Sequence, residues 1–127
     1  MADQKKKVLI VEDTKSYLWI LKEALEGQGF DVITAEDGEA GVETAIKENP
    51  DLILLDITMP KMDGIAASKK IKLAGIKAPI LFLTNMGDLK HISEAAETAT
   101  DYIVKAEVSV DDIVIRVKER LKVWVSK

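Results

Sequence analysis

The sequence predicts an α/β domain built on a parallel five-stranded sheet with the strands in the order 2-1-3-4-5. Two features of the 127 residues support this fold. Short apolar runs recur along the chain, and the segments between them are long enough for one helix each. The runs do not alternate apolar with polar residues, which favours strands buried on both faces, as in a parallel sheet.

Five segments are predicted as strands. Four are continuous apolar runs, and the second along the chain is weaker. In chain order they are Val8–Val11, Asp31–Ala35, Leu52–Leu55, Ile80–Leu83 and Tyr102–Val104. The three prolines, at positions 50, 60 and 79, fall between elements, where a missing N–H costs no ladder hydrogen bond.

The segments between the strands, and the one after the last strand, predict five helices. In the first of them, Gly27 and Gly29 are expected to end the helix. The residues expected on its buried stripe are Tyr17, Leu18, Ile20, Leu21, Ala24 and Leu25. Those expected on the apolar face of the last helix are Ile113, Val114, Val117, Leu121 and Trp124, and those covering its other side are Arg116, Lys118, Glu119 and Lys122. Such βα units without a linker predict one doubly wound, flavodoxin-like domain over residues 1–127.

The composition excludes several classes of protein. The chain has no cysteine, which excludes disulfide scaffolds, thiolate metal sites and cysteine nucleophiles. With 18 basic and 22 acidic residues, the net charge of −4 gives no footprint for nucleic acid or an anionic membrane. The apolar runs are too short for a signal peptide or a membrane span, so we expect a cytoplasmic protein.

Chemically active side chains follow the predicted strands. Open parallel sheets bind their ligands beyond the carboxyl ends of the strands. Glu12 and Asp13 follow the first strand, Asp56 the third, Thr84 the fourth and Lys105 the fifth. Because these four strands are neighbours in the order 2-1-3-4-5, we expect the five side chains to meet at one edge.

Each of these residues also has a purely structural interpretation. Asp13 could cap the first helix and Thr84 a turn, Asp56 could be a turn residue, and Lys105 could be a solvated lysine. Caps and turns do not require three carboxylates and an amine around one point. The combination therefore favours a functional site.

The residue types at this edge indicate phosphoryl chemistry. Three close carboxylates repel one another unless a cation neutralises them, and oxygen ligands without His or Cys favour Mg²⁺. No glycine-rich dinucleotide turn follows the first strand, and no P-loop is present. An acidic, magnesium-binding edge beside a lysine and a hydroxyl suits a phosphoryl group, with Asp56 as the nucleophile, Lys105 neutralising charge and Thr84 donating a hydrogen bond.

Three classes of protein are compatible with this set of residues. A phosphatase that works through an aspartyl phosphate would want a second acid two residues after the nucleophile, where this chain has Thr58. A phosphoacceptor without a general acid keeps its acyl phosphate long enough to signal, and this is the leading hypothesis. The alternative is an interaction module that keeps the fold without phosphorylation, and the complete set of site residues argues against it.

The chain resembles the receiver domain of two-component response regulators over essentially its whole length. The segments that carry the resemblance are Val8–Asp13, Leu54–Gly64, Ile80–Thr84 and Asp101–Lys105. The second contains the run Asp-x-x-Met-Pro-x-Met-Asp-Gly, which is specific by itself.

The resemblance implies a function and its cofactor. A histidine kinase or a histidine phosphotransfer protein would donate a phosphoryl group to Asp56, with Mg²⁺ required. Asp13 would bind the metal directly and Glu12 mostly through water, and the backbone carbonyl of Thr58 would complete the protein ligands.

The resemblance also implies how the signal is passed on. Thr84 and Tyr102 match a switch pair whose shift changes the face formed by the fourth helix, fifth strand and fifth helix. This face would bind a downstream protein or output domain. The chain would be a phosphoacceptor rather than an enzyme, and a monomer or a phosphorylation-dependent dimer.

The sequence departs from the family at three places. Ala106 follows Lys105 where the family usually has a cis proline, so we expect a trans bond there. Ala99 stands near a helix end where glycine is frequent. Asn85 follows Thr84 where a smaller residue is common, which bears on access to the phosphate. None of these changes removes a chemical group.

Three further side chains have competing interpretations. Trp19 is expected opposite the apolar stripe of the first helix, either lying over its neighbours or marking a partner site. Trp124 is expected in the core, and His91 is expected to be solvated on the fourth helix.

Overall fold

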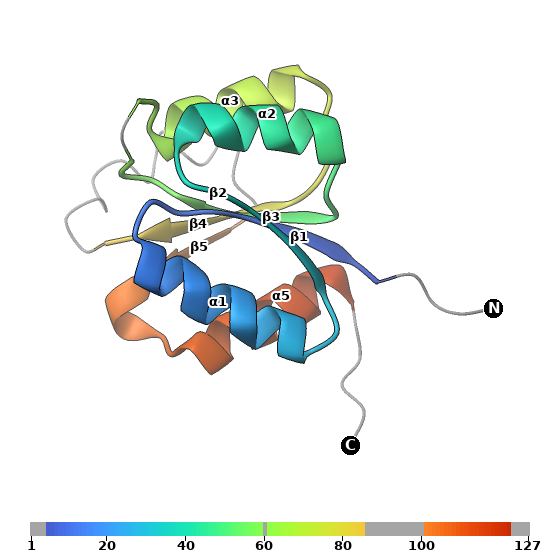
Figure 1. Cartoon of the computed structure of the whole chain (residues 1–127), viewed down its shortest axis with the longest axis vertical. Coiled ribbons are helices and arrows are strands. Elements are labelled where there is room, and N and C mark those ends of the chain that lie inside the picture. Colours follow the sequence, from blue (N-terminus) through green and yellow to red (C-terminus); the bar gives the residue numbers. More distant parts are fainter. Residues whose placement is uncertain (1–4, 60, 86–100, 123–127) are drawn as a thin grey trace.

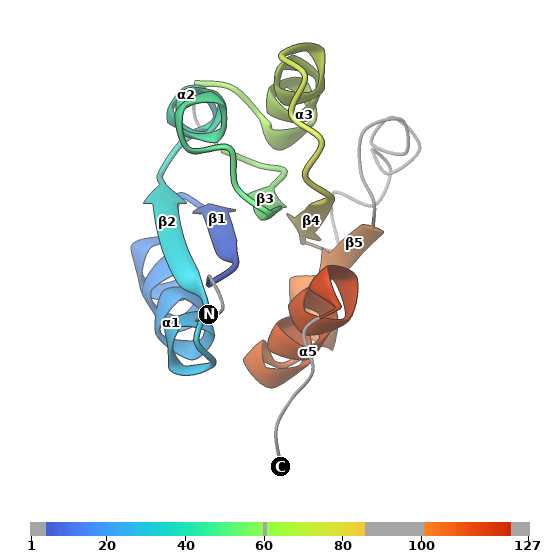
Figure 2. The ribbon, with the colours of Figure 1, turned by 90° about the vertical axis from the view of Figure 1, so that its right-hand side faces the viewer.

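The structure is a computed structural model that describes residues 5–59, 61–85 and 101–122. Its five-stranded sheet is parallel and has the order β2-β1-β3-β4-β5, which confirms the predicted topology. Figures 1 and 2 show α1 and α5 on one face of the sheet and α2 and α3 on the other.

Each predicted strand is present. The strands are β1 (Lys7–Val11), β2 (Asp31–Ala35), β3 (Leu52–Asp56), β4 (Ile80–Thr84) and β5 (Asp101–Val104). All residues of β3 and β4 are buried, as expected for strands covered on both faces. The edge strand β2 is largely half-exposed, which explains why its sequence signal is weaker.

Four α-helices lie in the described part of the chain. They are α1 (Lys15–Gly27), α2 (Gly38–Glu48), α3 (Gly64–Leu73) and α5 (Val110–Leu121), and a 3-10 turn spans Lys105–Glu107. The helix expected around His91 falls on residues 86–100, and Trp124 also lies outside the described residues. No helix among the described residues is long and apolar enough to cross a bilayer.

Two details of the predicted helix faces are wrong. Ile20 was expected on the buried stripe of α1, but it is 48% exposed, and Leu18, Leu21 and Leu25 form the buried stripe. Lys118 was expected on the outer side of α5, but it is buried and donates a hydrogen bond to the side chain of Gln28. Lys118 lies one turn from Val114 and next to Val117, so it shares their inward face.

The end of α1 agrees with the sequence. The helix ends at Gly27, and Gly29 has a φ of 93°, a left-handed conformation that glycine adopts without strain.

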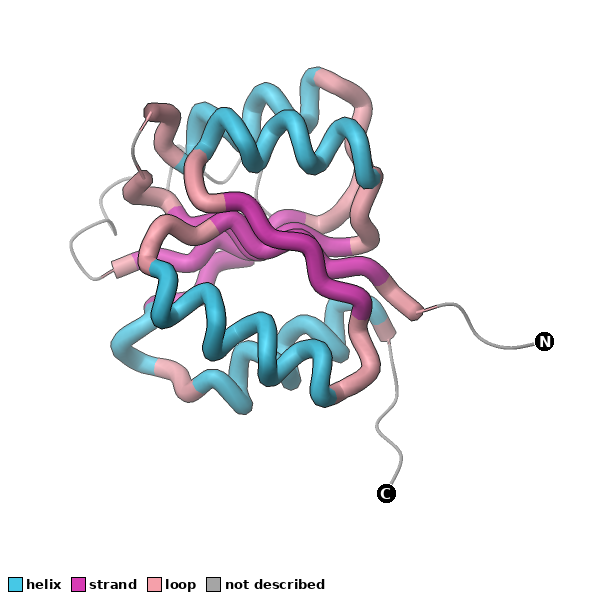
Figure 3. Tube along the Cα trace, viewed as in Figure 1, coloured by secondary structure: helices cyan, strands magenta, loops and turns pink. Residues whose placement is uncertain are grey.

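The carboxyl ends of the strands define one edge of the sheet. Because all five strands are parallel, the carboxyl ends of β1, β3 and β4 lie at the same edge, as Figure 3 shows. The chemically active residues therefore gather there.

Candidate functional site

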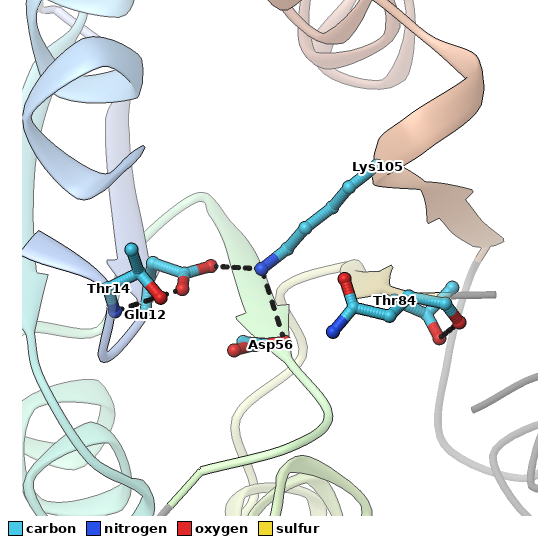
Figure 4. Close-up of polar contacts among 6 residues, drawn as sticks. Glu12, Thr14, Asp56, Thr84 and Lys105 are labelled. Carbon is cyan, nitrogen blue, oxygen red and sulfur yellow. Dashed lines mark hydrogen bonds and ion pairs between the residues drawn. The ribbon is translucent and has the colours of Figure 1, made fainter. Parts of the chain in front are cut away.

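Strand register brings the predicted site residues together. Val11 pairs with Leu55, so Glu12, directly after β1, lies beside Asp56, the last residue of the neighbouring β3. Thr84 pairs with Val104, so Lys105 follows directly beyond the partner of Thr84. Figure 4 shows Glu12, Asp56 and Lys105 around one point, with Thr84 to one side of them at the end of β4.

Three carboxylates in this site could hold a cation. Oxygen atoms of Glu12, Asp13 and Asp56 all lie within 4.8 Å of one another. Glu12 is fully buried, Asp56 is 3% exposed, and Asp13 is exposed. Among the residues that the structure describes, the buried Oδ1 atom of Asp56 has no hydrogen-bond partner, and it could accept a cation in addition to the Lys105 ammonium at 3.5 Å. This set of oxygen ligands fits Mg²⁺.

Lys105 reaches into the carboxylate cluster. Its Nζ atom donates to Oε1 of Glu12 at 2.8 Å and lies 3.5 Å from Oδ1 of Asp56 (Figure 4). The backbone N–H of Thr14 donates to the other oxygen of Glu12 at 3.1 Å. Only 16% of the Lys105 side chain is exposed, so its interpretation as a solvated lysine is wrong.

The environment of Asp56 disfavours its negative charge. Burial and then the charge of Glu12, with a smaller effect of Asp13, raise the pKa of Asp56 from 3.8 to about 7 against the opposing effect of Lys105. An added positive charge beside Asp56 would therefore stabilise its ionised carboxylate. The site is thus suited to bind a cation beside Asp56.

The structural interpretations of Asp13 and Asp56 also differ from what the structure shows, whereas the turn expected after Thr84 falls on residues outside the described ones. Thr14, not Asp13, is the N-cap of α1, and its side chain makes no capping hydrogen bond. Asp56 is the last residue of β3 rather than a turn residue. Thr84 is fully buried, and its hydroxyl donates to the backbone carbonyl of Asn85 at 3.0 Å. Thr58 is exposed two residues after Asp56.

The peptide bond between Lys105 and Ala106 is trans, as predicted, because the described residues contain no cis bond. The backbone instead enters the 3-10 turn of residues 105–107 directly after β5. The long side chain of Lys105 then covers the remaining distance to Glu12 and Asp56.

Glycine at position 64 lets α3 start against the end of β3. A Cβ atom on Gly64 would lie 2.1 Å from the backbone carbonyl oxygen of Asp56, which no side chain could tolerate. The preceding Asp63 caps the helix by accepting from the N–H of Ala66 at 2.8 Å. The Asp-Gly pair of the sequence run thus fixes the loop beside Asp56.

Sequence reasoning assigned Tyr17 to the core and missed its contact with the site. The ring centroid of Tyr17 lies 4.8 Å from Nζ of Lys105. Burial, and then the charges of Glu12 and Asp56, raise the pKa of Tyr17 to about 12, so the phenol stays neutral. The signal available in the sequence was its place in the first turn of the helix after Glu12 and Asp13.

Trp19 and Tyr102 are both exposed, at 58% and 43%. The Lys22 ammonium lies 5.6 Å from the ring centroid of Trp19, so this ring does lie beside a neighbouring side chain. Tyr102 stands in β5 opposite Phe82 of β4.

Comparisons with known proteins agree on one family. Residues 8–118 match the model of the response regulator receiver domain. The chain is 39% identical over 107 residues to the alkaline phosphatase synthesis transcriptional regulatory protein PhoP of Bacillus subtilis, which covers 84% of this chain and 40% of PhoP. It is 40% identical over 101 residues to the chemotaxis protein CheY of the same organism, which covers 78% of this chain and 84% of CheY.

Solved structures give the same result. A response regulator receiver domain protein (CheY-like) from Methanospirillum hungatei superposes with a TM-score of 0.85 at 29% identity, over 94% of this chain and 95% of that one. The chain spans about two fifths of the length of PhoP and most of CheY.

Proposed function

Because this chain belongs to the family of response regulator receiver domains, we propose that it is a switch in which Asp56 accepts a phosphoryl group. One observation supports this proposal above the others. Asp56 is a buried carboxylate with one oxygen that accepts no hydrogen bond from the described part of the chain, and Glu12, Asp13 and Lys105 lie beside it. A histidine kinase or a histidine phosphotransfer protein would be the donor.

Asp56, Lys105 and Thr84 would each have a different role in phosphoryl transfer. An ionised oxygen of Asp56 attacks phosphorus, a P–O bond forms, and the P–N bond of the donor breaks with its electron pair leaving on the imidazole nitrogen. The Lys105 ammonium neutralises charge on a phosphoryl oxygen, and the Thr84 hydroxyl donates a hydrogen bond to another. Thr58, two residues after Asp56, offers no carboxyl group to serve as a general acid or base, so the acyl phosphate persists.

We further propose that the site binds Mg²⁺. Asp13 and Asp56 would bind it through their carboxylates and Thr58 through its backbone carbonyl, and Glu12 would act through water. The bound ion supplies positive charge that neutralises the carboxylates and the oxygens of the phosphoryl group. This proposal rests on the three close carboxylates, of which Glu12 and Asp56 pair with the single ammonium group of Lys105.

Replacing Asp13 by alanine should weaken Mg²⁺ binding about tenfold or more, because a direct carboxylate ligand is lost. Glu12→Ala should weaken it less, since Glu12 acts through water. Isothermal titration with Mg²⁺ measures both affinities, and Glu23→Ala, an exposed carboxylate on α1, should leave the affinity unchanged. Equal losses for Asp13 and Glu12, or a larger loss for Glu12, would contradict these roles.

Thr84→Ala should still be phosphorylated but should lose the coupled change at Tyr102. The hydroxyl that would follow the phosphoryl oxygen is absent in this variant, whereas Thr84→Ser retains it. Chemical shifts of β5 amides, recorded before and after phosphorylation, measure the coupling. Full-sized shifts in Thr84→Ala would show that the two residues are not coupled.

The phosphoacceptor proposal is tested with Mg²⁺ and acetyl phosphate as a small phosphodonor. Intact mass spectrometry should show one added phosphoryl group that hydroxylamine removes, and Asp56→Asn should show none. The wild-type chain remaining unmodified, while it binds Mg²⁺ and stays folded, would favour the interaction module. Rapid turnover of the donor without accumulation would favour a phosphatase.

The remaining assignments follow from the same proposal. Phosphorylation would change the surface that includes β5 and α5, which a downstream protein or output domain would bind. Residues 1–127 would form one domain that works in the cytoplasm, as a monomer or as a phosphorylation-dependent dimer.

A further inference from the structure

We propose that Tyr17 is a positioning residue that holds the ammonium group of Lys105 beside Asp56 through the face of its ring. This inference rests on the proposed phosphorylation of Asp56, for which Lys105 supplies the positive charge. The site would then include Tyr17 of α1 in addition to the residues at the carboxyl ends of the strands.

The contact has the geometry of a cation–π interaction. The Nζ atom of Lys105 lies 4.8 Å from the centroid of the Tyr17 ring, well inside the range in which a ring face attracts a cation. The ring is half-buried and packs against the apolar cluster under α1 and α5, which includes Leu18 and Ile113. Packing therefore holds the Tyr17 ring in place, and the ammonium group of Lys105 contacts its face.

The backbone around Lys105 contributes little to this positioning. Lys105 is the first residue of a 3-10 turn with no buried residue, and Ala106 and Glu107 are exposed. The position of the ammonium group therefore depends on what its side chain contacts. The contacts described are Glu12 at 2.8 Å, Asp56 at 3.5 Å and the Tyr17 ring.

Tyr17 differs from the two carboxylates in one respect. Glu12 and Asp56 belong to the cluster proposed to hold Mg²⁺, so a bound ion competes with Lys105 for their negative charge. The uncharged ring of Tyr17 does not bind Mg²⁺. Its attraction for the ammonium group remains when a bound metal ion neutralises the carboxylates.

The same helix offers a matched control. Trp19 also has a lysine ammonium over its ring, that of Lys22 at 5.6 Å, but Trp19 is exposed and Lys22 contacts Glu26 rather than the site. Changing Trp19 removes a cation–π contact of the same kind on the same helix. It should leave the chemistry at Asp56 unchanged.

The contact itself is tested by NMR on the metal-free, unphosphorylated protein. A ring face over the end of Lys105 shifts the Hε resonances of this lysine upfield. The shift should persist in Tyr17→Phe, which keeps the ring, and should disappear in Tyr17→Met, which fills similar space without one. Its absence in the wild-type protein would overturn the inference, whether or not Asp56 is phosphorylated and whether or not Tyr17→Met folds.

The consequence for phosphorylation is tested at saturating Mg²⁺ with acetyl phosphate. The rate constant should fall about threefold to tenfold in Tyr17→Met and stay within about twofold in Tyr17→Phe, because the ring rather than the hydroxyl holds the ammonium. Trp19→Met should react like the wild-type protein.

The results that would contradict the positioning role of Tyr17 differ from those that would contradict the phosphorylation of Asp56. An unchanged rate in Tyr17→Met, or an equal loss in Tyr17→Phe, would overturn the positioning role. Failure of the wild-type protein to accept a phosphoryl group would overturn the proposed function, while the Hε shift would still report the contact.

Discussion

Replacing Asp56 by asparagine is expected to raise the free energy of unfolding of the metal-free protein by about 2–4 kcal/mol at pH 8. The pKa of Asp56 is raised from 3.8 to about 7, chiefly by burial and by Glu12. The folded wild-type chain therefore binds this proton more tightly than the unfolded chain. Above pH 7 the buried charge destabilises the fold, and the neutral amide removes that cost.

The upward direction of the pKa shift of Asp56 sets the pH range in which this residue changes the free energy of unfolding. Between about pH 4 and pH 7 the folded state holds a proton that the unfolded state has lost, so the stability contributed by Asp56 falls as the pH rises. Urea unfolding of both proteins at pH 4 and pH 8 should show a small difference at pH 4 and the full difference at pH 8. Asp31→Asn, at an exposed carboxylate of β2, is the control and should show no such trend. A constant difference across this range would show that Asp56 carries no buried charge.

Replacing Lys105 by methionine should have the opposite effect, lowering the free energy of unfolding by about 2–4 kcal/mol at pH 8. The Glu12 carboxylate is fully buried and accepts from Nζ of Lys105 at 2.8 Å, so it loses its charged partner. The backbone N–H of Thr14 remains as a donor but carries no full charge.

Mg²⁺ should restore much of this loss, because it supplies positive charge to the same cluster. Urea unfolding of Lys105→Met with and without Mg²⁺ measures the recovery, and Lys105→Arg, which keeps a positive charge, is the control. A stability unaffected by the loss of Lys105 would contradict the role of this lysine as the partner of Glu12.

The architecture could be predicted because each central strand carries its own signal. The runs that form β1, β3 and β4 are apolar on both faces, and the structure buries them on both faces. The order of the strands also fixes which residues follow neighbouring strands. For this reason the sequence alone placed Glu12, Asp56, Thr84 and Lys105 at one edge.

What the sequence could not predict are contacts that depend on how helices sit against the sheet. Helical periodicity assigned Lys118 to the outer side of α5, whereas packing against α1 buries it beside Gln28. Helical periodicity also assigned Tyr17 to the core. It did not show that the ammonium group of Lys105, 88 residues later, lies over the Tyr17 ring. It also gave no partner for Glu12, whose two oxygens accept from Lys105 and from Thr14.

Asp56, rather than another carboxylate of the cluster, is the expected acceptor of the phosphoryl group. Borohydride reduction of the protein phosphorylated with acetyl phosphate and Mg²⁺ converts an aspartyl phosphate to homoserine, and tandem mass spectrometry locates it. The tryptic peptide of residues 48–61 contains Asp51 and Asp56, so fragmentation between them assigns the site. We expect homoserine at position 56 alone. Homoserine at position 13 or 51, with position 56 unmodified, would contradict the account.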